Sequence, residues 1–114
     1  IRPDGHPYFS VSKGGIIRIN REGSKLLQLK SGDKINILQD EERPKDWYVE
    51  KTTDELGLIM RDTNKNSGLV CNASAIAAEM IRSLSLSLKT TTMRIAPKPA
   101  EGEIYAILTG SGKT

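Results

Sequence analysis

The chain has 114 residues and a formal net charge of +3, and its hydrophobic (37%) and charged (27%) fractions are those of an ordinary soluble globular domain. No apolar run approaches the roughly 18 residues that cross a membrane, which excludes a spanning helix and predicts no membrane partner. Because there is one cysteine, Cys71, and no charged-then-apolar leader, the sequence excludes an intramolecular disulfide and predicts a cytoplasmic location.

The first half of the chain, residues 8–52, predicts four strands around one short helix. Polar and apolar side chains alternate with a period of two in each strand, which gives each strand one apolar face. Asn20 is of the residue type that caps a helix N-terminus, and Gly32 ends the segment that follows it. The predicted strands cover residues 8–12, 15–20, 33–39 and 47–51.

The second half, residues 56–109, predicts the same order of elements. Residues 73–84 carry apolar side chains every four positions, which indicates a helix, and Asn72 is its predicted N-cap. The segment 85–91 fits either a loop or an added strand, and residues 110–114 fit a frayed tail. The predicted strands cover residues 56–61, 69–71, 92–96 and 103–109.

The shared order predicts an internal repeat. We expect one α+β domain, mostly β, over residues 1–114: a small closed barrel of two ββαββ halves, 8–52 and 56–109, related by a pseudo-twofold axis, with one short helix in each. One half alone would bury too little surface to fold, whereas two halves could close a barrel and remove their exposed edges. The alternative is a generic α+β meander whose halves coincide by chance.

The stretch that carries most information is residues 15–33, and its most specific part is LQLKSGD at residues 27–33. With Gly15 and Ile19, it resembles the AbrB/MazE-like swapped-hairpin family of transcription regulators and antitoxin DNA-binding domains. In that family two chains each give one unit and interleave into a barrel. The resemblance therefore implies a barrel made by one chain that carries both units, as in related double-psi barrels, and a DNA-binding function.

The same stretch departs from the family pattern at several positions. Ile16 stands where a basic residue is usual, Asn20 replaces a proline, and the pair at residues 23–24 (GS) replaces an apolar residue and an arginine. Two positions that usually carry cationic contacts are therefore neutral. The stretch predicts the fold more strongly than it predicts DNA binding.

The remaining functional signal is a set of basic residues near the predicted turns and helix of the two halves. Around a pseudo-twofold axis they could form two basic lobes that neutralise phosphates. The alternative is that they only keep the protein soluble, because acidic residues are interspersed with them along the chain. The predicted nucleic-acid-binding residues are Lys13, Arg18, Arg21, Lys25, Arg61 and Lys65.

Nothing in the sequence indicates catalysis, so we expect a protein that is not an enzyme and has no cofactor and no metal site. One His and one Cys, far apart, make neither a nucleophilic pair nor a zinc site. The segment 110–114 (GSGKT) resembles the end of a phosphate loop, but Ile107 stands where that motif needs glycine. Three functions stay open: binding to double-stranded DNA in transcription regulation, a protein-interaction or assembly module (including homo-oligomers), and a small-molecule-binding barrel.

Overall fold

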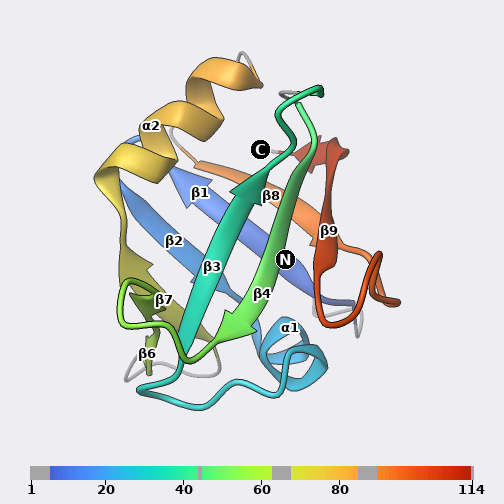
Figure 1. Cartoon of the computed structure of the whole chain (residues 1–114). Coiled ribbons are helices and arrows are strands. Elements are labelled where there is room, and N and C mark those ends of the chain that lie inside the picture. Colours follow the sequence, from blue (N-terminus) through green and yellow to red (C-terminus); the bar gives the residue numbers. More distant parts are fainter. Residues whose placement is uncertain (1–5, 44, 63–67, 85–89, 114) are drawn as a thin grey trace.

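The computed structural model describes residues 6–43, 45–62, 68–84 and 90–113 (Figure 1). The helices are α1 (Arg21–Leu26) and α2 (Ser74–Ser83). The strands are β1 (Tyr8–Ser12), β2 (Ile16–Ile19), β3 (Lys34–Gln39), β4 (Trp47–Thr52), β5 (Leu58–Ile59), β6 (Arg61–Asp62), β7 (Leu69–Asn72), β8 (Thr90–Ile95) and β9 (Tyr105–Lys113).

All strands belong to one antiparallel sheet that curls into a nearly closed barrel. The strand order is β5-β3-β4-β9-β8-β1-β2-β7-β6, so β5 and β6 are the two ends of the sheet. In Figure 1, β3 and β4 form the front of the barrel, β1, β2 and β8 form the back, and the two helices lie near opposite ends. The prediction of a mostly β barrel with two helices is confirmed at this level.

The barrel is nearly closed by the chain itself at Met60, which is fully buried. Its N–H donates to the carbonyl of Asp33 at 2.8 Å, and its own carbonyl accepts from the N–H of Gly32 at 2.7 Å. The chain thereby passes from β5, which pairs with β3, to β6, which pairs with β7. The single strand predicted over residues 56–61 is therefore wrong in detail: there are two short strands, one on either side of Met60.

The interior is filled from the alternating apolar positions that the sequence indicates. In β1, β2, β4, β7 and β8, buried side chains alternate with more exposed ones that face outward. Ile37 departs from this pattern, since it is only half-buried although it faces inward. The largest fully buried side chains are Phe9, Val11, Ile17, Ile19, Ile35, Val49, Met60, Met80, Met93 and Ile95.

Helix α1 begins as predicted, because Asn20 is its N-cap. The Asn20 side-chain oxygen accepts from the N–H of Gly23 at 2.9 Å and from the N–H of Tyr8 at 2.8 Å, which ties the helix to β1. Gly23 is buried against β2, where an added Cβ would lie 2.7 Å from Cγ2 of Ile19. This close approach explains a glycine inside a short helix that it would otherwise weaken.

Helix α2 is confirmed, but its predicted cap is wrong. The N-cap residue is Ala73, without a side-chain hydrogen bond, and Asn72 belongs to β7. The N–H of Ala73 donates to the carbonyl of Gly15 at 2.8 Å, so packing against the β1–β2 turn sets where the helix begins. At the other end, the indole N–H of Trp47 donates to the Ser83 hydroxyl at 3.0 Å and fixes the helix over β4.

The last two strands differ from their predicted bounds. Strand β8 begins at Thr90, two residues earlier than expected, and β9 continues to Lys113, through the segment predicted to be a frayed tail. Pairing of Thr92 with Lys113, beyond a register shift next to Arg94, accounts for the extension. The polar turn at 63–67 and most of the uncertain segment 85–91 lie outside the described residues.

Candidate nucleic-acid interface

One wall of the barrel is built from strands that contain no acidic residue. Strands β8, β1, β2 and β7 are adjacent in the sheet, and their sequences (TTTMRI, YFSVS, IIRI and LVCN) lack Asp and Glu. Because their apolar side chains point inward, the outward positions are left to hydroxyl, amide and guanidinium groups together with Ile16 and Val70. The result is a sheet surface whose own strands supply positively charged side chains and no carboxylate.

A single row of cross-strand neighbours runs over this wall. Ser10 pairs with Thr92 and with Arg18, Arg18 pairs with Val70, and Val70 pairs with Arg61. Directly paired residues project to the same side of a sheet. We call the outward side chains of this row the basic face: Thr92, Ser10, Arg18, Val70 and Arg61.

The two arginines of the basic face flank Val70, so they stand two strand spacings, or roughly 10 Å, apart. Both are exposed, and neither has a carboxylate within ion-pair distance among the residues that the structure describes. The hydroxyls of Ser10 and Thr92 lie 2.9 Å apart beside them. The face therefore presents two unneutralised guanidinium groups and two hydroxyls in one line.

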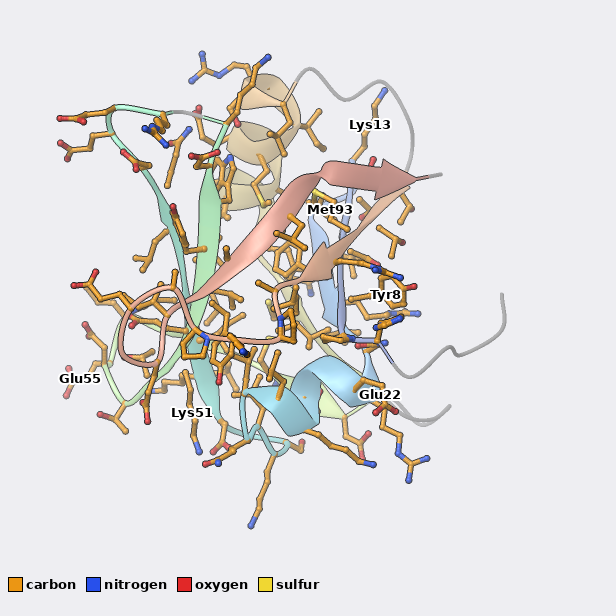
Figure 2. The ribbon with its side chains drawn as sticks, turned by 90° about the vertical axis from the view of Figure 1, so that its right-hand side faces the viewer. Tyr8, Lys13, Glu22, Lys51, Glu55 and Met93 are labelled. Carbon is orange, nitrogen blue, oxygen red and sulfur yellow. The ribbon has the colours of Figure 1, made fainter. Side chains whose placement is uncertain are left out.

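Lys13 lies at the same side of the barrel, in the exposed turn between β1 and β2. Figure 2 shows Lys13 and Tyr8 projecting from one side, Glu55 projecting from the opposite side, and Met93 in between. In the same view the acidic Glu22 lies below Tyr8, on α1 rather than on the sheet. Its carboxylate borders the basic face without interrupting its row.

The other predicted basic residues are placed apart from the row. Arg21 and Lys25 lie on successive turns of α1 and line a groove of about 290 Å³, which also contains the Asp62 carboxylate and the Ser31 hydroxyl. The fold therefore divides the predicted basic residues between a sheet face and a helix groove. Lys65 lies outside the described residues.

Several polar residues of this wall are not among those predicted from the sequence. Tyr8 pairs with Arg94 in the row next to Ser10 and Thr92, and all four are outward-facing strand residues. A signal for them was present: the four predicted strands of this wall contain no carboxylate, and three of them contain a cation or a hydroxyl. It was not visible as a patch, because only the strand order brings residues 8–19 next to residues 69–72 and 90–95.

The titratable groups elsewhere do not indicate a reactive centre. Burial raises the pKa of the Cys71 thiol to about 11, so this side chain is a protonated, inward-facing part of the core at neutral pH. Within the described ranges, no group of three or more His, Cys, Asp or Glu side chains could hold a metal ion. Nor does this part of the chain include a helix long and apolar enough to cross a membrane.

The chain was compared with protein families, curated proteins and solved structures. No family model, no curated protein and no solved structure matches the chain. The class of protein is therefore argued from the fold and the basic face alone.

Proposed function

We propose that this protein binds double-stranded DNA through the basic face, as a small non-enzymatic DNA-binding or transcription-regulatory protein. The observation that carries the proposal is the pair Arg18 and Arg61, held on either side of Val70 in a cross-strand row that contains no carboxylate. Guanidinium groups bind phosphate oxygens in a fixed fork geometry, and hydroxyls donate to the same oxygens. Lys13 adds a third charge at the edge of this surface.

A duplex suits the basic face better than a single strand does. Single-strand binding surfaces stack successive bases on aromatic side chains. Of the five aromatic residues, Tyr8 belongs to this wall, and Phe9 and Trp47 are buried in the core. Tyr48 is on the far wall, and Tyr105 packs against the core. A surface of cations and hydroxyls would contact the sugar-phosphate backbone, which positions a protein on DNA without reading its sequence.

We also propose that residues 8–52 and 56–109 are two copies of one unit, as the resemblance to the AbrB/MazE-like family implies. The strand pairings support this reading. With β5 and β6 together taken as the counterpart of β1, the pairs β1–β2 and β3–β4 correspond to β6–β7 and β8–β9. In the same way β1–β8 corresponds to β5–β3. The remaining pairs, β2–β7 and β4–β9, each join a strand to its own counterpart, as a twofold axis requires.

The test of DNA binding is a fluorescence-anisotropy titration of a labelled 20-base-pair duplex over a range of salt concentrations. Each phosphate that a cation neutralises contributes about −0.9 to the slope of log affinity against log salt. Arg18, Arg61 and Lys13 together predict a slope of about −3. No binding at low salt, or an affinity that does not change with salt, would rule the proposal out.

A second titration with a single strand of the same length tests the choice of partner. We expect weaker binding than to the duplex, because the basic face has no row of aromatic side chains. Binding that is tighter to the single strand, at equal salt, would contradict the preference for duplex DNA while leaving the basic face as the binding surface.

A further inference from the structure

A groove of about 370 Å³ lies on the outer side of β3 and β4, beside the loop that connects β8 and β9. Its apolar part comes from Leu38, Tyr48 and Ile104, which are all half-buried. Two carboxylates border it, on Asp40 and Glu101, and its lining contains no Lys or Arg. The groove is therefore apolar in part and negatively charged at its border.

The opposite wall carries an element of complementary chemistry. Ile16 is 45% exposed although it is a large apolar side chain, and it faces outward on β2. Arg18 projects from the same face two residues further on, and Lys13 lies in the turn just before it. An exposed isoleucine between two cations matches a partly apolar groove between two carboxylates.

We propose that Ile16 of one copy docks into the groove of a second copy, with Arg18 and Lys13 placed against Glu101 and Asp40. Strands β2 and β4 are on opposite sides of the barrel, so the two elements cannot meet within one molecule. A copy whose Ile16 is docked in a neighbour still has its own groove free to accept the Ile16 of a third copy. The contact is therefore head-to-tail and forms rings or open chains rather than a closed symmetric pair.

The contact is small, so the association is weak. One apolar side chain and two partly exposed charge pairs place it at the low end of protein interfaces. The charge pairs lie at the surface and are screened by salt. Self-association should therefore rise with protein concentration and fall with ionic strength.

Sedimentation equilibrium of the full chain without DNA tests the proposal at low salt. The monomer of 12.5 kDa should give way to dimers and larger species as concentration rises. Ile16→Ser and Glu101→Lys should each weaken association about tenfold or more, and about 0.5 M salt should do the same. The matched control is Glu55→Lys, a charge reversal of an exposed acid outside the groove, which should leave association unchanged.

A mixing experiment tests the head-to-tail geometry. Ile16→Ser keeps an intact groove and Glu101→Lys keeps an intact Ile16 element, so each variant alone should associate at least about tenfold more weakly than the wild type. Their mixture should stop at a dimer, whereas the wild type continues beyond it. A wild type that stays monomeric at all concentrations, or association that Ile16→Ser and Glu101→Lys leave unchanged, would overturn the proposal.

The proposed contact and the proposed DNA binding share Arg18 but can fail separately. Sedimentation without DNA measures the first, and anisotropy with dilute protein measures the second. If both hold, excess duplex should dissociate the assemblies, because DNA and the groove compete for Arg18. Assemblies that persist in saturating duplex would show that the groove does not use Arg18, which contradicts the pairing proposed here.

Discussion

The two walls of the barrel have the same inner chemistry and different outer chemistry. On the wall of β3 and β4, Lys51 lies 3.5 Å from the Asp33 carboxylate, and the Asn36 amide donates to Glu50 at 3.1 Å. On the opposite wall, Arg18 and Arg61 are not balanced by any carboxylate on the basic face. Burial selects the inner side chains of both walls in the same way, so the outer side chains are where function can differ.

The net charge of +3 understates this difference. Most acidic residues lie in the loops around the wall of β3 and β4, at residues 40–46, 54–55 and 101–103. The strands of the other wall carry none, apart from Asp62 at the end of β6, which faces away from Arg61 into the helix groove. A chain with evenly spaced charges can therefore fold into a molecule with separate cationic and anionic sides.

The largest expected effect tests whether the inner faces are equivalent. Ile17 and Ile35 are fully buried on opposite walls, so Ile17→Ala and Ile35→Ala should each lower the free energy of unfolding by about 2–5 kcal/mol. Urea denaturation measures both. If either substitution lowers the free energy of unfolding by less than about 1 kcal/mol, the two walls do not share one close-packed core.

The next largest effect tests whether the outer faces differ. The double substitution Arg18→Ala and Arg61→Ala should weaken duplex binding between about 10- and 100-fold at 0.1 M salt and make the salt slope shallower by about 2. The matched control removes two exposed lysines outside the basic face, Lys30→Ala and Lys98→Ala, and should change the slope by much less. Equal losses in the two variants would mean that binding follows net charge and not the basic face.

A smaller effect distinguishes two asparagines on the same wall, Asn20 directly after β2 and Asn72 at the end of β7. Asn20→Ala removes the α1 cap and the bond to Tyr8, and should cost about 0.5–2 kcal/mol. Asn72→Ala removes no cap and should change the free energy of unfolding by less than about 0.5 kcal/mol. Thermal or urea unfolding of the two variants measures the difference, and equal costs would contradict the unequal capping of the two helices.

The smallest effect concerns the ion pair on the wall of β3 and β4. The Lys30 backbone N–H and then Lys51 lower the pKa of Asp33 below 3.8. A lowered pKa contributes stability above about pH 4, and the contribution is lost as the pH falls through the folded-state value. Asp33→Asn should therefore lower the melting temperature slightly at pH 7. The difference in melting temperature between the variant and the wild type should shrink below about pH 4. A difference that persists at pH 2 would mean that the charge of Asp33 is not the cause.

The candidate site shows the limit of residue-by-residue inference. Lys13, Arg18 and Arg61 were identified as basic residues of turns and strands, and the structure places them at one wall. Arg94, Ser10 and Thr92 were not identified, because a polar outward residue on a strand is ordinary until its cross-strand neighbours are known. The same holds for the acidic groove, whose lining comes from three separate parts of the chain.

By itself the sequence determined the local features of this protein. The period-2 alternation set the inner faces, Asn20 set the start of α1, and residues 30–33 form the expected turn, in which Asp33 and Lys30 exchange hydrogen bonds. These features depend on side chains within a few residues of one another. For that reason these features can be predicted from the sequence alone.

Features that depend on pairing between segments far apart in the chain were decided only by the tertiary structure. Met60 splits a strand because the turn at residues 32–33 takes its backbone hydrogen bonds, and α2 begins after Asn72 because Ala73 bonds to Gly15. Arg18 and Arg61 become neighbours only because β7 lies between β2 and β6. Strand order is set by the closure of the whole core, so the charge pattern of each wall is a property of the fold and not of any one segment.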